Sequence, residues 1–138
     1  MAMNDKWLLA PLLMLTSCAL PRGYRVADHV TVQDDPAHAR FVLRYQNDTR
    51  RTICLSPDRW PNEAGYIPLT DPPDIWVSVG QQRFPLDTFT EECPTCGFKV
   101  KGKSAIAGYL NYSAFKIPDA LAKERKELHL PVAGSACD

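Results

Sequence analysis

Proline interrupts this chain so often that a long helix has little room to form. Twelve of the 138 residues are proline, and each proline removes a backbone donor and disfavours a helix interior. Between the prolines, apolar residues recur with the two-residue period of strands. Residues 40–46 show this most clearly, because apolar and polar side chains alternate there without a break. The sequence therefore predicts an all-β domain.

Turn residues divide the chain into short segments. After a weakly alternating stretch at 26–32, the pattern predicts strands at 40–46, 51–55, 66–69, 74–79, 82–86, 98–100, 104–112 and 127–132. Residues 119–126 are the one stretch of helical character, with Asp119 as a suitable N-cap. About seven short strands with turns between them are typical of an antiparallel immunoglobulin-like β-sandwich, and a small closed barrel is the alternative. The cysteine–tryptophan–cysteine spacing of antibody domains is missing, so the similarity concerns architecture only.

The N-terminus has the features of an export signal. An apolar run at 7–15 follows Lys6, and it is too short to span a bilayer, which needs about 20 apolar residues. The run ends in Leu15-Thr16-Ser17-Cys18, which resembles the lipobox of bacterial lipoprotein precursors. In that family the cysteine is acylated through its sulfur and, once the chain is cut before it, becomes the new N-terminus. An ordinary signal peptide with a chance cysteine near its end is the alternative.

The resemblance implies a division of the chain and a location. Residues 1–17 would be the signal peptide, 18–25 the lipidated cysteine and a tether, and 26–138 the β-sandwich domain. The lipid on Cys18 would anchor the protein in a membrane, which would then be its first binding partner. Ala19, in place of aspartate, follows the cysteine, which resembles proteins sorted to the outer membrane and facing the periplasm.

Export would place the mature chain in an oxidising compartment. Its remaining cysteines are Cys54, Cys93, Cys96 and Cys137. Four cysteines allow two disulfides in three alternative pairings, and the spacing does not choose among them.

The segment Cys93-Pro-Thr-Cys96-Gly97 has three interpretations. It resembles the knuckle of a zinc ribbon, but only Cys54 and Cys137 are left to complete a four-thiolate site. It also resembles a thioredoxin motif, but strand residues and not a helix follow it. We therefore favour structural disulfides.

The sequence shows no other motif that indicates a catalytic or metal-binding site. No histidines lie at metal-ligand spacing and no nucleophile elbow is present, so we expect no enzymatic activity, no metal and no cofactor. The formal net charge of zero argues against nucleic acid as a partner.

Three aromatic residues, Trp60, Tyr66 and Trp76, are candidates for a binding surface, because Trp76 points away from the apolar face of its strand. Cover of Trp76 by the loop at 60–69 is the alternative. The expected function is a non-enzymatic binding or structural module that presents loops 56–74 and 87–97 to an envelope protein. A hydrolase inhibitor, or a thiol-disulfide or zinc protein that uses Cys93 and Cys96, is the alternative.

Overall fold

The computed structural model describes residues 20–68, 74–87 and 97–137. The strands in this part are β1 (Val30–Asp35), β2 (Arg40–Gln46), β3 (Ile53–Leu55), β4 (Trp76–Val79), β5 (Gln82–Pro85), β6 (Phe98–Val100), β7 (Ala105–Asn111), β8 (Lys126–His129) and β9 (Gly134–Ala136). Between them lie short 3-10 helices, namely η1 (Val26–His29), η2 (Pro36–His38), η3 (Pro57–Arg59), η4 (Tyr112–Phe115) and η5 (Asp119–Leu121). The prediction of an all-β domain is confirmed.

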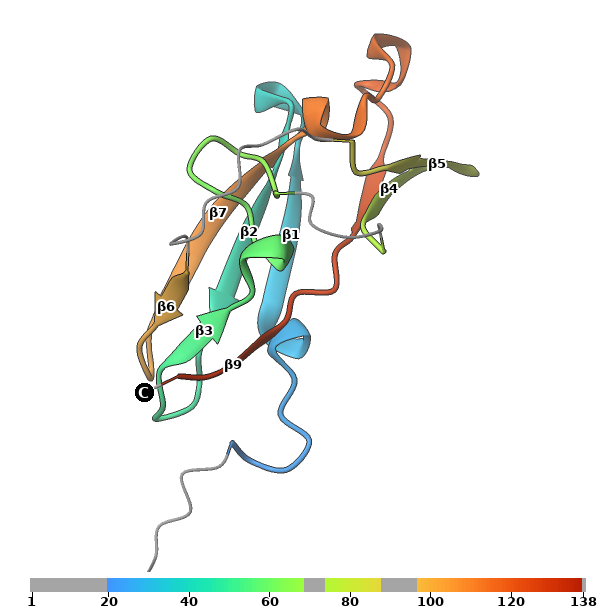
Figure 1. The fold of residues 1–138 in the computed structure, drawn as a ribbon. Helices are drawn as coiled ribbons and strands as arrows, with labels where there is room; N and C mark the ends of the chain where they lie inside the picture. The colour runs from blue at the N-terminus through green and yellow to red at the C-terminus, as the bar shows by residue number, and fades with distance from the viewer. Residues whose placement is uncertain (1–19, 69–73, 88–96, 138) are drawn as a thin grey trace, which may run out of the picture.

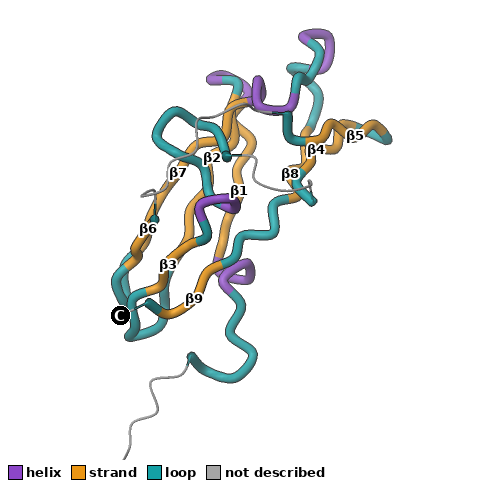
Figure 2. The backbone as a smooth tube through the Cα atoms, viewed as in Figure 1, coloured by secondary structure: helices purple, strands orange, loops and turns teal. Residues whose placement is uncertain are grey.

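The strands form three antiparallel sheets (Figures 1 and 2). Their orders are β1-β2-β7, β6-β3-β9 and β5-β4-β8. The C-terminal segment links the last two sheets, because β8 pairs with β4 and the following β9 pairs with β3. No helix in the described ranges is long and apolar enough to cross a membrane.

The alternation in β2 explains how the first sheet builds the core. Phe41, Leu43 and Tyr45 are all fully buried, whereas Arg44 between them is exposed. Ile53 of β3 and residues of β4 belong to the same buried cluster. Burial of one such side chain contributes about 1.5–3 kcal/mol relative to exposure, which makes this face the main source of stability.

The short helix predicted at 119–126 is confirmed only in part. Only η5 (Asp119–Leu121) forms, and the Asp119 side chain makes no capping bond. Lys126 explains the difference, because its buried ammonium group donates hydrogen bonds to the carbonyls of Ala122, at 2.6 Å, and Glu124, at 2.8 Å. In an α-helix the Ala122 carbonyl would instead accept a hydrogen bond from the Lys126 backbone.

Two further expectations need correction. The segment at 26–32 begins as helix η1 with Val26 in the core, and the strand starts only at Val30. Residues 66–68 form no strand, and residue 69 lies outside the described residues. Strand β9 was not expected, because Gly134-Ser-Ala136 lacks apolar alternation and depends on its pairing with β3.

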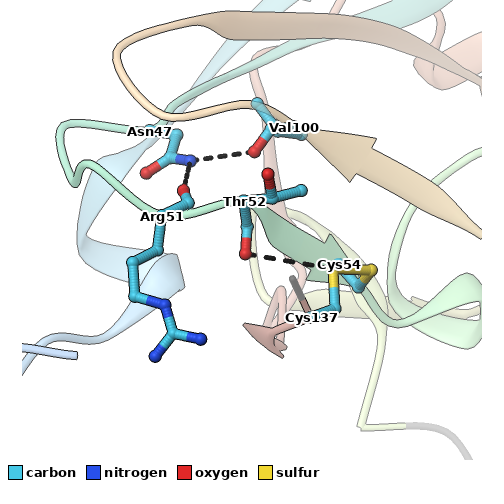
Figure 3. Close-up of a disulfide and its surroundings, with 6 residues drawn as sticks. All are labelled: Asn47, Arg51, Thr52, Cys54, Val100 and Cys137. Atoms are coloured by element: carbon cyan, nitrogen blue, oxygen red, sulfur yellow. Dashed lines mark hydrogen bonds between the residues drawn. A yellow bond between two sulfur atoms is a disulfide. The ribbon is translucent and has the colours of Figure 1, made fainter. Parts of the chain in front are cut away.

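A buried carboxamide joins the first two sheets at one end (Figure 3). Asn47 is fully buried, and its Nδ2 donates to the carbonyl oxygens of Arg51, at 2.7 Å, and Val100, at 2.9 Å. Its Oδ1 accepts hydrogen bonds from the backbone and the hydroxyl of Thr49. The expected turn at 47–49 is therefore also a bridge between the loop after β2 and the end of β6.

One disulfide is present in the described part of the chain. Cys54 of β3 is bonded to Cys137, which lies 83 positions later and follows β9 (Figure 3). Cys93 and Cys96 lie outside the described residues. Because Cys54 and Cys137 are bonded to each other, they do not complete a four-thiolate zinc site with the other two cysteines.

Replacement of Asn47 tests the bridge. We expect Asn47→Ala to lower the free energy of unfolding by about 2–4 kcal/mol, since several buried backbone groups lose their partners. Urea denaturation followed by circular dichroism measures the change. Gln33→Ala, at an exposed position of β1, is the control and should alter stability by less than about 0.5 kcal/mol. Equal losses in the two variants would contradict the role of Asn47.

The disulfide closes a long loop, so its removal should lower the free energy of unfolding. The double variant Cys54→Ser/Cys137→Ser is expected to lose about 4 kcal/mol of unfolding free energy, mainly because the unfolded chain becomes less restricted. The measurement is the urea midpoint with and without reductant. Any effect of reductant on the double variant then reports on the remaining cysteines, which are Cys18, Cys93 and Cys96. A urea midpoint equal to that of the parent protein would refute the assignment of the Cys54–Cys137 disulfide.

Candidate binding groove

The structure does not gather the three candidate aromatic residues into one exposed patch. Trp60 is only 1% exposed and belongs to the core. Tyr66 is half-buried, and its hydroxyl lies 3.0 Å from the Ser113 hydroxyl. Trp76 is half-buried on β4, in a different sheet from the strand that Trp60 contacts.

Trp76 lies between two neighbours from its own sheet. Its ring stacks on His129 of β8, with centroids 3.8 Å apart and an interplanar angle of 17°. The guanidinium of Arg83 from β5 lies 4.8 Å from the ring centroid, a distance at which a cation attracts an aromatic face. The ring therefore has contacts from adjacent strands, where the sequence suggested either an open ring or cover by the loop at 60–69.

Trp60 forms one wall of a groove of about 370 Å³ beside β7. The groove is lined by Trp60, Pro61, Asn62, Glu63, Phe98, Ile106, Ala107, Gly108 and Tyr109. Gly108 allows the close approach, because a Cβ atom there would lie 3.0 Å from Pro61 Cγ and 3.1 Å from Trp60 Nε1. The missing side chain on β7 thus makes room for the indole ring.

The groove is lined by part of one loop that was expected to carry recognition and by the strand that follows the other. Residues 60–63 come from loop 56–74, and Phe98 directly follows loop 87–97. Strands β6 and β7 run along the same side of the molecule (Figure 1). The contribution of Ile106, Gly108 and Tyr109 was not predicted from the sequence. An outward aromatic residue in the alternating segment 104–112 was the available signal.

Strand β7 is an edge strand in the part of the chain that the structure describes, where it pairs only with β2. The Asn47 amide donates to the Ser104 carbonyl and the Tyr112 amide donates to the Ala39 carbonyl, both at 2.9 Å. Because antiparallel pairs alternate, the even-numbered residues of β7 bond to β2 and the odd-numbered residues face the open side.

The open side of β7 carries a regular row of polar backbone groups. Among the described residues, the amides and carbonyls of Ala105, Ala107 and Tyr109 have no backbone partner. The row ends at Asn111, whose amide donates to the Gly65 carbonyl at 2.9 Å. An exposed row of this kind is a template for a further strand.

An aromatic side chain with a fixed cation marks the outer rim of the groove. Tyr109 is 44% exposed, and the Arg40 guanidinium lies 4.0 Å from its ring centroid. Arg40 is held by Asp35, with Nε 3.2 Å from a carboxylate oxygen. The hydrogen bond from His38 lowers the pKa of the Asp35 carboxyl, with a smaller contribution from Arg40, so this carboxylate remains charged.

No other type of site emerges from the described ranges, in which no three histidine, cysteine or acidic residues gather as a metal site. Cys18, the expected lipidation site, lies outside these ranges. Comparison of the chain with protein-family models, with curated proteins and with solved structures finds no match. The groove and the open edge of β7 therefore define a candidate peptide-binding surface on geometry alone.

The two tryptophans of the domain should differ in their effect on stability. We expect Trp60→Ala to cost about 3–5 kcal/mol, because it empties a core position next to Gly108. Trp76→Ala should cost about 1 kcal/mol, mainly through loss of its stacking contacts. Urea denaturation of both variants measures the difference, and a larger loss for Trp76→Ala would contradict this placement.

Proposed function

We propose that this protein is a lipid-anchored, non-enzymatic binding module of the cell envelope that captures an extended segment of a partner protein along β7. The observation that carries the proposal is the row of backbone groups at Ala105, Ala107 and Tyr109 that have no backbone partner among the described residues and lie beside an apolar groove. An extended segment supplies complementary amides and carbonyls at the same two-residue spacing.

The groove supplies the specificity that backbone pairing lacks. Alternate side chains of an added strand point to the same face, so every second side chain of the partner would enter the space between Trp60, Phe98 and Ile106. These groove walls are mainly apolar, which favours aliphatic or aromatic residues at those positions. The rim at Tyr109 and Arg40 favours an aromatic or acidic residue on the other face.

The proposed location follows from the N-terminal sequence. The lipobox-like Leu15-Thr16-Ser17-Cys18 supports cleavage before Cys18 and acylation of that residue. The Cys54–Cys137 disulfide supports an oxidising compartment. We place the domain, as an immunoglobulin-like sandwich, on the periplasmic side of the outer membrane. Three antiparallel sheets that share one buried cluster support that architecture.

Acylation can be tested on the full-length protein. Cells that express it are labelled with a clickable palmitate analogue, and the N-terminal peptide is analysed by mass spectrometry. We expect acyl chains on Cys18 and a new N-terminus at that residue. Cys18→Ala should lose the label and leave the membrane fraction, whereas Cys54→Ala should keep the label. A label that persists in Cys18→Ala would exclude the lipobox assignment.

Strand capture can be tested by proline substitution at the open edge. The Ala107 amide points away from β2, so Ala107→Pro removes an outward donor and leaves the pairing with β2 intact. Val32→Pro is the matched control, because Val32 lies on β1 at the opposite edge of the same sheet and by register also points away from β2.

Both variants would carry a photo-crosslinking amino acid at Tyr109. We expect Ala107→Pro to reduce the yield of crosslinked envelope protein about tenfold, the effect of losing one backbone hydrogen bond. The yield in Val32→Pro should match that of the parent. Equal yields in both variants, with both shown to be folded by circular dichroism, would rule out capture along β7.

A further inference from the structure

The segment that precedes β1 is fixed to one end of the domain. Leu20 and Tyr24 pack against the core, so residues 20–25 of the expected tether lie against the domain. The Tyr24 hydroxyl lies 2.8 Å from the Tyr45 hydroxyl, and the Tyr24 ring stacks on His29 with centroids 4.6 Å apart. His29 in turn lies 3.2 Å from the Asp48 carboxylate in the loop after β2.

This end, which we call the basal end, consists of residues 20–29, 48–52 and 99–104. Figures 1 and 2 show the N-terminal segment leaving the domain beside the loop after β2 and the turn between β6 and β7. The last two are joined, because the Lys103 amide donates to the Thr49 carbonyl at 3.0 Å and the Lys103 ammonium group donates to the Asp48 carbonyl at 2.5 Å.

The length of chain before the basal end limits its distance from the proposed anchor. A single residue, Ala19, separates Cys18 from Leu20. Because successive Cα atoms lie about 3.8 Å apart, the Cα atoms of Cys18 and Leu20 are at most about 7.6 Å apart. A lipid on Cys18 would therefore hold the basal end at the bilayer surface.

The basal end is also the place where positive charge gathers. Its basic residues are Arg22, Arg25, Arg50, Arg51, Lys99, Lys101 and Lys103, and its acidic residues are Asp28 and Asp48. All of the basic residues except Arg51, which is half-buried, are exposed. The whole chain has a formal net charge of zero, so this excess is a local feature and not a property of the composition.

We propose that the basal end binds the anionic headgroups of the membrane that holds the protein. The inference rests on the proposed acylation of Cys18 for the position of the membrane, and on the charge of the basal end for the contact itself. Each basic side chain close to an anionic bilayer strengthens binding roughly fivefold at low salt. The attraction fades beyond about 8 Å at physiological salt, so the short connection to Cys18 is what makes it effective.

The test uses the full-length protein purified from membranes and placed in vesicles of phosphatidylcholine, with or without phosphatidylglycerol. The rate at which acetic anhydride modifies each lysine is measured by mass spectrometry. We expect Lys101 and Lys103 to be protected severalfold by phosphatidylglycerol, and we expect high salt to remove the protection. Lys116 and Lys123, which are exposed but outside the basal end, should react alike in both vesicles.

A pair of matched variants isolates the charge effect. Arg22→Gln/Arg50→Gln removes two exposed charges from the basal end and keeps both reporter lysines. Arg44→Gln/Arg125→Gln removes two exposed charges elsewhere. The first variant should bind phosphatidylglycerol vesicles about 25-fold more weakly at low salt, when acylation is prevented by Cys18→Ala in both. The second should bind as the Cys18→Ala parent does.

The outcomes separate this inference from the proposed anchor. Acylated protein with equal lysine reactivity in both vesicles overturns the headgroup contact and leaves the anchor in place. Protein without acyl chains that still binds phosphatidylglycerol vesicles through Arg22 and Arg50 overturns the anchor and supports the contact. Protein that is neither acylated nor retained on these vesicles overturns both.

Discussion

The arrangement of the first two sheets depends on the hydrogen bonds of one buried side chain. The Asn47 carboxamide holds the loop after β2 against the carbonyls at the end of β6, so the first two sheets are joined where the chain passes between them. A buried carboxamide without hydrogen-bond partners would lower the free energy of unfolding. The loop after β2 is therefore restricted to the position against β6 in which these bonds form. With this end fixed, β6 and β7 lie along one side of the molecule, and the groove between them and residues 60–63 keeps its shape.

Alternation made the strands of the core predictable. Phe41, Leu43 and Tyr45 point inward because a period of two leaves no other way to bury them together. The alternation of apolar residues did not predict the structure where hydrogen bonds of the backbone and of polar side chains determine it. The Lys126 ammonium group replaces the helical bond to Ala122, and β9 depends on a neighbour and a disulfide that no local pattern encodes.

Only part of the candidate site could be predicted from the sequence. Trp60 was singled out as an aromatic residue in a loop, but its burial against Gly108 depends on a contact between residues 48 positions apart. The open edge of β7 was not predictable either, because strand order in a sheet follows from long-range pairing. The sequence predicted that loops 56–74 and 87–97 would carry recognition. Residues 60–63 of the first loop line the groove, whereas from the region of the second loop only Phe98, in the strand that follows it, does so.

The pairing of β3 with β9 has a consequence for the order in which the chain becomes structured. β3 acquires its second neighbour only with β9, and its disulfide partner Cys137 lies 83 positions after Cys54. β4 likewise acquires its second neighbour only with β8. One side of β3 and one side of β4 therefore stay without their strand neighbours until β8 and β9 are synthesised, and a nascent chain that ends before β8 also leaves Cys54 without Cys137.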